Sequence, residues 1–572
     1  MTISATITPA ASGNPEEAEP EAPPFIERRG LPAAAPKRIA HIVSVSGSQA
    51  IAVLEREALA QGEETRVEIG QLVKVTTPAS SVVGLISAVS APAPASGRGD
   101  EDLRLVEINL AGEVVIDPRD DRLAFRRGVT HLPALGDAVL LADRHDLTRV
   151  YTQPNVATIE VGSLYQDAAV PARFLVDDLL AKHFIVVGTT GCGKSCALTT
   201  ILQRVLDAHG HAHIVMLDVH NEYPTAFGER AELINPNNLH LPFWLLNFQE
   251  LSAALTSGDA YHEAETEILG DAVLAAKRRY SDASANRQLA RRPGDAGGMT
   301  VDAPTPFRLS DVLSFIDEQL GKLERTQKTL PYRRLKNRIE TLASDQRYSF
   351  MFGSLTVQDT MTDILARLFR VPNEGRPITV IDLSTVPPEI LDVVISVISR
   401  LAFDLAVWSK GGLPMLLVCE EAHRYAPAAG DGFEPTRQAL SRIAKEGRKY
   451  GLSLALVTQR PSELDTTILS QCSTVVAMRL STERDQQVMR SNTHDSALDL
   501  LDFLPLLGDR EAIVLGQGVA MPMRIRFSEV AEQGVPRNLN SAFSLSWSRP
   551  NLDRAGLEAI VSRWRHAGRE RG

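Results

Sequence analysis

The chain has 572 residues, of which 44% are hydrophobic and 23% charged, an ordinary composition for a globular protein of several domains with a large buried core. No apolar run reaches the roughly 18 residues that a membrane-spanning helix requires, and the N-terminus lacks the features of a secretory signal, so we expect a cytoplasmic protein with no membrane partner. The net charge of −11 excludes a surface coated in basic charge. Any contact with nucleic acid must therefore come from local basic patches or from positive charge facing a central pore.

Segments of different pattern follow one another along the chain. Residues 1–36 are rich in Ala, Pro and Glu and are predicted to be disordered. Residues 37–165 contain short β-type runs such as HIVSVSG and LVKVTT between turn residues, which indicates a small β-barrel domain. Residues 166–535 alternate apolar strands with longer helical stretches, a pattern typical of an α/β domain with a parallel sheet. Residues 536–572 form a tail with one amphipathic helix, LEAIVSRWRH.

The α/β segment contains apolar runs of strand length, and a long helical stretch separates the second run from the third. That stretch is too long for one crossover helix, so we predict a helical insert at about 240–375. Within it, residues 281–298 are expected to form a flexible loop. The runs are HFIVVG at 183–188, HIVMLD at 213–218, ITVIDL at 378–383, MLLVCE at 415–420, LSLALVT at 452–458, VVAMRL at 475–480 and, as a possible further strand, AIVLG at 512–516.

The first of these strands leads into GTTGCGKS, which fits the phosphate-binding pattern G-x-x-x-x-G-K-[ST] without mismatch. Its glycines let the backbone turn N–H groups toward phosphate oxygens, and the following helix adds the positive end of its dipole. Lys194 is expected to reach the β- and γ-phosphates of ATP, and Ser195 to bind Mg²⁺. Cys192 and Cys196 are expected to react with alkylating agents, and bound ATP to protect them. The predicted nucleotide-binding residues here are Gly188, Thr189, Thr190, Gly191, Cys192, Gly193, Lys194, Ser195 and Cys196.

Acidic side chains end several of the predicted strands, where parallel sheets place their ligands. The 415–420 strand supplies two adjacent acids, of which Glu420 is predicted to serve the metal and Glu421 to polarise the attacking water. Asp218 and Asp382 end two other strands. Asp382 lacks a neighbouring acid, and we interpret it as a structural residue.

Polar side chains around the 452–458 strand could complete the site. Gln459, directly after the strand, can sense the γ-phosphate or the water, or can cap the next element. The preceding stretch SRIAKEGRKYG carries several cations, among them Arg442 and Arg448, which form either a solvated face or the source of an arginine finger. A finger given to a neighbour would complete each site from the next subunit, a head-to-tail contact that closes into a ring.

The combination of GTTGCGKS, LDVHNEY, VCEEAHRYAP, AKEGRKYG and VTQRP resembles the HerA group of the FtsK–HerA ATPases, over residues from about 38 to 527. The resemblance implies an α/β fold: a RecA-like P-loop ATPase core with a helical insert, preceded by a small N-terminal β-barrel (a HAS-barrel). The stretch FRRGVTHLPALGDAVLLAD is similar to part of that barrel.

The family's motifs assign roles to acidic residues by position. LDVHNEY is similar to the family's Asp-x-His-Gly-Glu-Tyr segment, so Asp218 and Glu222 correspond to its acidic members and are expected to contribute to nucleotide binding. Asn221 stands in place of the usual glycine. The usual Asp-Glu pair is Glu420–Glu421 here, and the longer Glu420 can still coordinate Mg²⁺ through water.

The resemblance also implies an assembly and a polymer substrate. Gln459 looks like the sensor, Arg448 like the finger acting in trans, and Arg442 is second to it. The family resemblance implies a homohexamer with DNA passing through its centre. The protein would contact this DNA without recognising its base sequence. Basic clusters at 277–292 and 325–347 could contact DNA phosphates, or could be solvated helical faces.

Three functions remain open at this stage. The first is an ATP-hydrolysing, ring-shaped translocase or helicase on duplex DNA that works with a nuclease or another effector protein. The second is an ATPase ring that acts mainly as assembly scaffold and activator of an anti-phage effector. The third is an ATPase of the secretion or conjugation type, against which the lack of a membrane segment argues.

Overall fold

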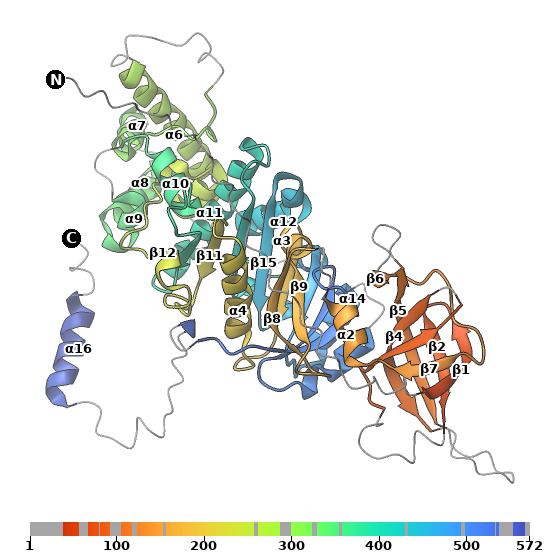
Figure 1. Ribbon diagram of the computed structural model, residues 1–572. Helices are drawn as coiled ribbons and strands as arrows, with labels where there is room; N and C mark the ends of the chain where they lie inside the picture. Colours follow the sequence, from red (N-terminus) through yellow and green to blue (C-terminus); the bar gives the residue numbers. More distant parts are fainter. Residues whose placement is uncertain are drawn as a thin grey trace, which may run out of the picture.

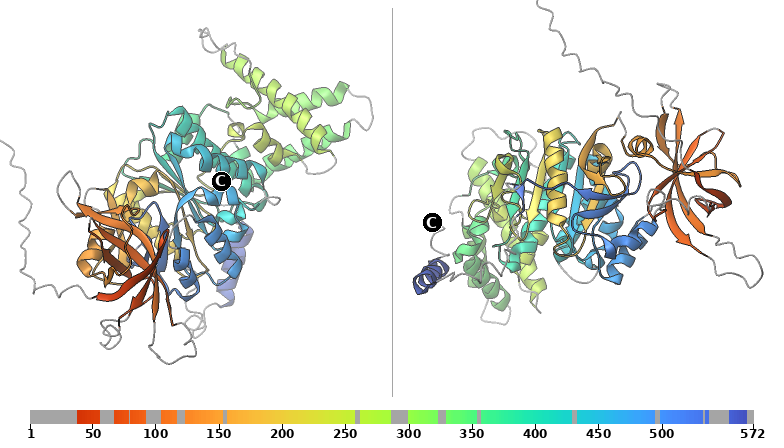
Figure 2. Two further views of the ribbon diagram at one scale, coloured as in Figure 1. Left: turned by 90° about the vertical axis from the view of Figure 1, so that its right-hand side faces the viewer. Right: turned by 60° about the horizontal axis from the view of Figure 1, so that its bottom comes forward.

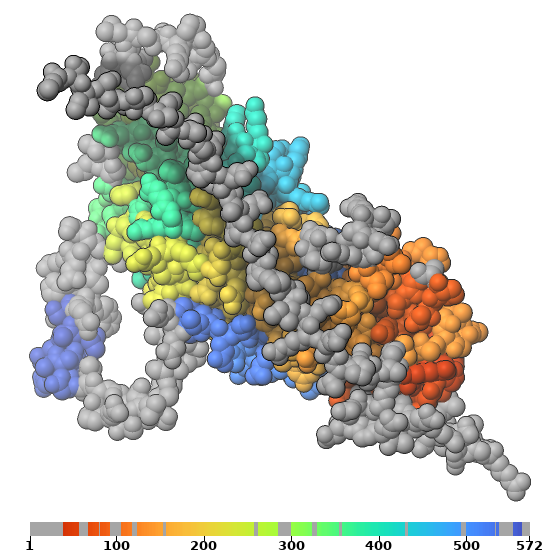
Figure 3. Space-filling model, in the orientation of Figure 1, coloured from red at the N-terminus to blue at the C-terminus, as the bar shows by residue number. Residues whose placement is uncertain are grey.

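The structure is a computed structural model, and its barrel, large sheet and helical insert follow one another along the long axis of the molecule (Figure 1). The space-filling view shows the C-terminal part of the core (blue) beside segments from much earlier in the chain (yellow and orange) (Figure 3). The structure describes residues 38–55, 67–78, 80–91, 104–116, 123–152, 156–256, 261–285, 299–322, 329–353, 357–428, 433–493, 498–531, 534–536 and 553–566.

The N-terminal domain is a closed antiparallel barrel with one extra strand. The strands follow the order β2-β1-β7-β3-β4-β5, β2 pairs with β5 to close the barrel, and β6 extends β5. Alternate side chains point inward, as the two-residue period of a strand requires, and build a separate core around Ile42, Val75 and Ile108. The strands are β1 (Arg38–Ser46), β2 (Gln49–Leu54), β3 (Leu72–Thr76), β4 (Ser81–Ser90), β5 (Leu105–Ile116), β6 (Leu123–Arg127) and β7 (Ala138–Leu141).

Hydrogen bonds attach this barrel to the large domain. The Arg127 guanidinium at the end of β6 donates to the carbonyls of Gly516, Val519 and Ala520 over distances of 2.6 to 2.8 Å. Helix α2 (Arg144–Tyr151), which has a capping box at Asp143, follows the barrel and leads into the next domain.

The large domain is built on an 11-stranded sheet in the order β12-β13-β11-β14-β15-β10-β16-β17-β18-β8-β9. The strands from β12 to β16 are parallel, and the remaining neighbours pair antiparallel. The central strands are runs of branched apolar residues buried on both faces, as expected where helices cover a parallel sheet. The strands are β8 (Thr158–Leu164), β9 (Pro171–Leu175), β10 (His183–Val187), β11 (Ile214–Asp218), β12 (Ala231–Ile234), β13 (Ile378–Asp382), β14 (Met415–Cys419), β15 (Leu452–Thr458), β16 (Cys472–Ala477), β17 (Glu511–Gly516) and β18 (Met523–Phe527).

Helices pack on this sheet and connect its strands, as the two views in Figure 2 show. The α-helices of the core are α3 (Val176–Leu180), α4 (Lys194–Ala208), α11 (Pro388–Trp408), α12 (Glu434–Glu446), α13 (Thr466–Ser470) and α14 (Glu483–Asn492), and α16 (Arg554–His566) lies in the tail. The 3-10 helices are η2 (Gly228–Arg230), η3 (Phe243–Leu245), η5 (Gln346–Tyr348), η6 (Ala422–Arg424), η7 (Gly447–Tyr450), η8 (Pro461–Glu463) and η9 (Leu498–Leu506).

A helical insert lies between β12 and β13, at the end of the molecule away from the barrel (Figure 1). A buried ion pair joins it to α11: Arg400 Nη2 lies 2.9 Å from Glu250 Oε2, and Ser396 Oγ donates to Glu250 Oε1 at 2.8 Å. Glu250 also accepts from the Asn247 N–H in the capping box of α5. The helices are α5 (Phe248–Leu255), α6 (His262–Ala285), α7 (Leu309–Lys322), α8 (Leu330–Ser344), α9 (Ser349–Phe352) and α10 (Met361–Phe369).

The predicted fold class is confirmed: an α/β core with a helical insert follows a small β-barrel. One predicted boundary does not match the sheets. The barrel segment 37–165 was expected to include β8, but β8 pairs with β18 and belongs to the large sheet. Its alternating pattern looks like that of a barrel strand, and only the pairing decides which sheet it joins. Segment 1–36 lies outside the described residues, as do parts of the 281–298 loop and of the 536–572 tail.

Among the residues that the structure describes, no helix combines the length and the apolar character needed to cross a membrane.

Candidate nucleotide site

The loop Gly188–Ser195 joins β10 to α4 at the carboxyl edge of the parallel strands. Gly191 and Gly193 have φ angles of 82° and 101°, which side-chain-bearing residues rarely adopt. At Gly188 a Cβ atom would lie 2.7 Å from Cys192 Sγ and 2.9 Å from Met478 Cβ, so the loop closes only around a glycine. The three glycines therefore shape the tight turn that the phosphate-binding motif requires.

The polar side chains of the loop reach neighbouring strand ends. Lys194 Nζ donates to the Thr189 carbonyl at 3.1 Å, and Ser195 Oγ donates to Glu222 Oε2 at 2.6 Å. Glu222 belongs to the turn after β11, so the structure brings the loop and the LDVHNEY segment together.

Asp218 holds that turn in place. It is fully buried, and its carboxylate accepts the N–H groups of His220, Glu222 and Tyr223 at 3.0 to 3.2 Å. Asn221 has a φ of 57°, a left-handed conformation that asparagine tolerates better than most residues, and so it can stand in for glycine. From these contacts we infer that Asp218 positions Glu222, and its expected contribution to nucleotide binding stays a prediction.

The two acids after β14 have opposite electrostatic environments. Glu420 is buried, and burial together with the charges of Glu222, Asp218 and Glu421 raises its pKa well above the usual value. Tyr223 donates its hydroxyl proton to Glu420 Oε1 at 3.4 Å. The buried carboxyl group of Glu420 therefore favours its neutral form more than an exposed glutamate does.

The pKa of Glu421 is shifted in the opposite direction. Burial raises the pKa of Glu421, but the hydrogen bond and charge of His423 and the charges of Lys194 and His220 outweigh burial and leave the pKa below its usual value. His423 Nδ1 lies 3.2 Å from Glu421 Oε2. Glu421 also has a φ of 49°, a strained conformation for a side-chain-bearing residue that is common at functional sites. Adjacent carboxyl groups with separated pKa values are a mark of acid–base function.

Gln459, the expected sensor, also lies at this edge. It follows β15, which separates the loop strand β10 from the acid strand β14, and it accepts a hydrogen bond from Thr190 Oγ1 in the loop. Thr458 Oγ1, one residue earlier, lies 3.0 Å from His423 Nδ1. One chain thus brings together the loop, the acid pair and Gln459.

The two arginines expected to act as fingers lie elsewhere. Arg448, in η7, immediately precedes β15, whereas Gln459 follows it, so the two residues stand at opposite edges of the sheet. Arg442 is exposed on α12, and its guanidinium stacks over the Phe403 ring at 4.3 Å. Arg448 therefore lies away from the phosphate loop of its own chain.

The structure changes the expectation for the two cysteines at the loop. Cys192 is fully buried, and burial raises the pKa of its thiol. Cys196 is half-buried on the first turn of α4, and burial raises its thiol pKa as well. The sequence hypothesis that both thiols react is therefore restricted to Cys196, because a buried neutral thiol is inert.

Sequence reasoning did not find the residues that support the site from other elements. His423 and Tyr223 orient the acids. Both residues stand within two positions of a predicted acid in the sequence, so they could have been proposed as site residues. Arg479 and Arg510 flank the loop: the Arg479 carbonyl accepts the Thr189 N–H at 2.8 Å. Their position depends on how β16 and β17 pair, which the sequence does not reveal.

The oxygen donors at this edge fit a hard divalent cation such as Mg²⁺. Within the described ranges there is no group of three or more His, Cys, Asp or Glu that could hold a metal by itself. Mg²⁺ is commonly held by one or two carboxylates together with substrate phosphates. The Ser195 hydroxyl contacts the carboxylate of Glu222, whereas the Glu420 carboxyl group is hydrogen-bonded to the Tyr223 hydroxyl. The expected direct role of Glu420 at the metal stays a prediction, and Glu222 is the nearer carboxylate.

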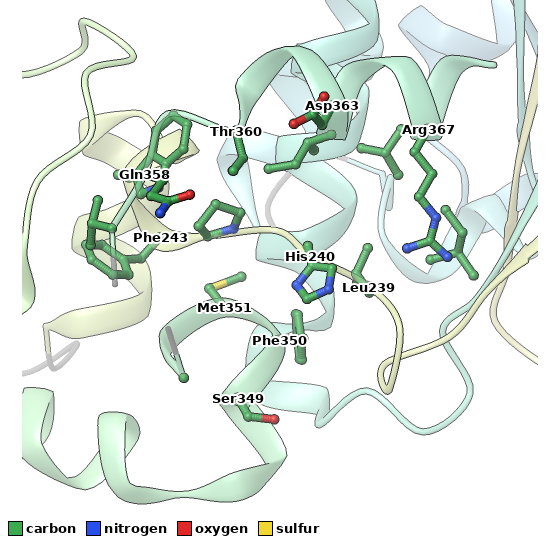
Figure 4. A pocket seen from close by; sticks show the side chains of 17 residues that line it. Leu239, His240, Phe243, Ser349, Phe350, Met351, Gln358, Thr360, Asp363 and Arg367 are labelled. Carbon is green, nitrogen blue, oxygen red and sulfur yellow. The ribbon is translucent and has the colours of Figure 1, made fainter. Parts of the chain in front are cut away.

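A separate cavity of about 510 Å³ lies between the edge of the sheet and the insert. Figure 4 shows Asp363 and Arg367 of α10 on one side of it, and Phe350 and Met351 of α9 on the other. Arg367 is paired with Glu232 at 3.1 Å, and most of the lining is apolar. The phosphate loop does not line this cavity, so we assign it to the packing of the insert.

The sheet order, the glycine-shaped loop and the acids at the neighbouring strand ends define a P-loop ATPase with a RecA-like core. Residues 159–402 match the family model described as helicase HerA, central domain. This match confirms the resemblance to the HerA group that the motifs predicted.

Curated relatives match much of the chain. The DNA double-strand break repair helicase HerA of Pyrococcus furiosus is 24% identical over 421 residues, which cover 65% of this chain and 70% of the relative. The protein of the same name from Sulfurisphaera tokodaii is 24% identical over 485 residues, covering 82% of this chain and 89% of the relative.

Solved structures with a related arrangement include VirB4 of Thermoanaerobacter pseudethanolicus, with a TM-score of 0.43 and 14% identity over 67% of this chain and 99% of that one. The plasmid coupling protein TrwB in complex with the GTP analogue GDPNP has a TM-score of 0.44 and 12% identity over 70% of this chain and 95% of that one. Because both TM-scores are below 0.5, the fold assignment rests on the sheet order and the phosphate loop.

Proposed function

We propose that this protein is an ATP-driven translocase or helicase that moves along duplex DNA as a homohexameric ring, together with a nuclease or another effector protein. The observation that carries the proposal is the gathering of the phosphate loop, the acid pair and Gln459 at one edge of the sheet. The loop, the acid pair and Gln459 share one edge, and Arg448 lies at the other. With Arg448 as the arginine finger, each site would be completed by the next subunit, and a head-to-tail contact of this kind closes into a ring.

In the proposed reaction the residues of the chain have separate roles. The N–H groups of the loop and Lys194 hold the phosphates, and Ser195 with Glu222 holds Mg²⁺, which neutralises phosphate charge when bound. Glu421, ionised and oriented by His423, accepts a hydrogen bond from the attacking water. Gln459 orients the same water or reports on the γ-phosphate.

Relatives support DNA as the substrate on which this hydrolysis acts. The matched proteins of Pyrococcus furiosus and Sulfurisphaera tokodaii are named DNA double-strand break repair helicases. A motor that moves along any sequence needs contacts to phosphates and none to bases, and these come from a few well-placed cations.

In the described parts of the two basic clusters, some cations are buried or paired, and only the exposed ones are candidates for contacts to DNA phosphates. Lys277 is buried and donates to the carbonyls of Val301 and Ala303 at 2.5 and 2.6 Å, so it is a structural residue. Arg278, on the same helix, is exposed. Residues 286–292 of the first cluster and 325–328 of the second lie outside the described residues.

The second cluster contains both paired and exposed cations. Lys336 Nζ lies 2.6 Å from Asp317, and Arg347 lies 2.7 Å from Asp345. Arg333 and Arg338, on the same helix as Lys336, are exposed and are the better candidates for contacts to DNA phosphates.

ATPase activity of the purified protein, measured with and without duplex DNA at low salt, tests the proposal. We expect duplex DNA to stimulate hydrolysis, with the stimulation falling as salt rises. The variant Lys194→Ala serves as the inactive control. Hydrolysis that duplex DNA leaves unchanged at low salt, alone and with a co-purified partner, would contradict a DNA motor. Effector activity that survives Glu421→Gln would favour an assembly scaffold.

A further inference from the structure

His183 is a buried histidine at the amino edge of the parallel strands, where it begins β10, the strand that leads into the phosphate loop. Burial lowers the pKa of its imidazole. The hydrogen bond to the Ala444 carbonyl opposes this shift, and the positive charge of Arg448 adds to it. The ring therefore favours its neutral form more than an exposed histidine does.

Two hydrogen bonds fix the orientation and the tautomer of this ring. The backbone N–H of Leu454, in β15, donates to His183 Nδ1 at 2.9 Å, so this nitrogen carries no proton. The proton of the neutral ring is then on Nε2, which lies 2.9 Å from the Ala444 carbonyl oxygen in α12 and donates to it. Each ring nitrogen thus contacts a different element of the core.

The imidazole serves backbone groups that regular secondary structure leaves without a partner. The pairing of β10 with β15 begins at Phe184 and Ala455, so Leu454 stands one residue before it. Ala444 lies in the last turn of α12, where carbonyls lack a partner within the helix. Both residues are buried, and buried backbone groups need a hydrogen-bond partner. His183 supplies one to each.

The two contacts lie on either side of the turn that carries Arg448. The chain runs from α12 through η7 into β15, so Ala444 precedes Arg448 by one helical turn and Leu454 follows it in the strand. Gly447 lets this turn lie against β15, because a Cβ there would be 2.4 Å from the Leu452 carbonyl oxygen. Arg448 itself is exposed. One buried side chain therefore holds both ends of a turn that presents an exposed guanidinium.

We propose that His183 is a positioning residue for Arg448, which it holds in place by tying the end of α12 and the start of β15 to the first residue of the loop strand. This role depends on the proposed function, in which Arg448 completes the site of the next subunit. A defect at His183 should then appear in the neighbour's site, although β10 leads directly into the phosphate loop of its own chain.

Two amide variants separate the two contacts. In His183→Asn the amide oxygen takes the place of Nδ1 and can accept the Leu454 N–H, but no group replaces Nε2. In His183→Gln the amide nitrogen takes the place of Nε2 and can donate to the Ala444 carbonyl, but no group replaces Nδ1. Since the Ala444 contact holds the helix end just before Arg448, His183→Asn is the variant that should release the turn.

Steady-state ATP hydrolysis measures the effect on the reaction. His183→Asn should lower kcat by about tenfold or more and leave KM within about twofold of wild type, because a small displacement of a group that acts in the transition state is costly. His183→Gln should stay within about threefold of the wild-type kcat. The matched control is His211→Asn, an exposed histidine before β11 at the same edge of the sheet, which should keep the wild-type rate.

Mixed assemblies show which subunit's site the defect affects. His183→Asn is co-assembled with Lys194→Ala in one sample and with Arg448→Ala in another, and mixing is verified by distinct tags. With Lys194→Ala, about a quarter of the sites should combine an intact loop with an intact turn from the neighbour, and hydrolysis should rise to about that fraction of wild type. With Arg448→Ala it should not rise, because both variants are defective in the same contribution.

Restored hydrolysis with Arg448→Ala and none with Lys194→Ala would overturn the inference, since His183 would then serve the loop of its own chain. A wild-type kcat in His183→Asn would overturn it too. Retained ATP binding shows that a variant is folded, and if His183→Asn fails this check, His183→Phe, which lacks both hydrogen bonds, takes its place in the same mixtures. The mixture of Lys194→Ala with Arg448→Ala tests the finger in trans by itself, so failure of the proposed ring is read separately from failure of the role of His183.

Discussion

Replacing Arg448 by alanine tests whether one subunit completes the hydrolysis site of the next. β15 has seven residues, which at about 3.3 Å per residue separates Arg448 from Gln459 by about 20 Å. That distance is several times the reach of an arginine side chain, so Arg448 cannot contact the nucleotide of its own chain. An arginine finger contributes roughly three orders of magnitude or more to hydrolysis. Arg448→Ala should therefore lower the ATPase rate by about that factor and leave ATP binding unchanged.

Mixed assemblies decide whether the residue acts across subunits. Lys194→Ala lacks the loop lysine but retains the finger, and Arg448→Ala has the opposite defect. In an equal random mixture, about a quarter of the sites should combine an intact loop with an intact finger from the neighbour, and activity should return to about that fraction of wild type. The neighbouring exposed cation gives a matched control, and Lys449→Ala should keep its activity.

The assay is steady-state ATP hydrolysis after the two variants have been unfolded and refolded together or co-expressed, with subunit mixing verified by distinct tags. Two inactive variants that stay inactive after proven mixing would refute a finger in trans. So would an Arg448→Ala variant that hydrolyses ATP at the wild-type rate.

The remaining predictions concern the acid pair, the insert and two buried titratable groups. Glu421→Gln should bind ATP normally in a filter or calorimetric assay but hydrolyse it about two orders of magnitude more slowly, since the ionised acceptor for the water is gone; unchanged turnover would exclude Glu421 from the chemistry. Arg400→Ala should leave the Glu250 charge buried and alone, and lower the free energy of unfolding by about 3–5 kcal/mol in urea denaturation; a loss below about 1 kcal/mol would contradict a buried pair. Cys196 should be alkylated slowly and be protected by ATP, which peptide mass mapping checks; equal labelling with and without saturating ATP would speak against its place at the site. Burial lowers the pKa of Lys277 from 10.5 to about 8, so between these pH values the unfolded chain binds more protons than the folded chain. The free energy of unfolding of the wild type should therefore rise from pH 8 to pH 10.5 relative to Lys277→Met, by roughly 3 kcal/mol at most. Parallel pH profiles of the two proteins would disprove this assignment.

Local patterns were sufficient for much of the core. The phosphate loop could be located from GTTGCGKS alone, because the glycine positions and the strand and helix around it are encoded within a few residues. The strands at 183–188, 213–218, 415–420 and 452–458 were recognisable as continuous apolar runs, since a strand covered on both faces needs apolar residues at every position. Acidic residues at the ends of such strands predicted where the site lies, because parallel sheets bind ligands at the carboxyl ends of their strands.

Pairing between distant segments decided the rest. β8 and a barrel strand have the same alternating pattern, and only its hydrogen bonds to β18 assign it to the large sheet. The opposite pKa shifts of Glu420 and Glu421 arise from burial and from the contact with His423, not from their identical side chains. The approach of Arg510 to the loop depends on the antiparallel direction of β17. A residue's own sequence neighbours determine its local conformation, but its charge state and its ligands depend on groups that the fold brings from elsewhere in the chain.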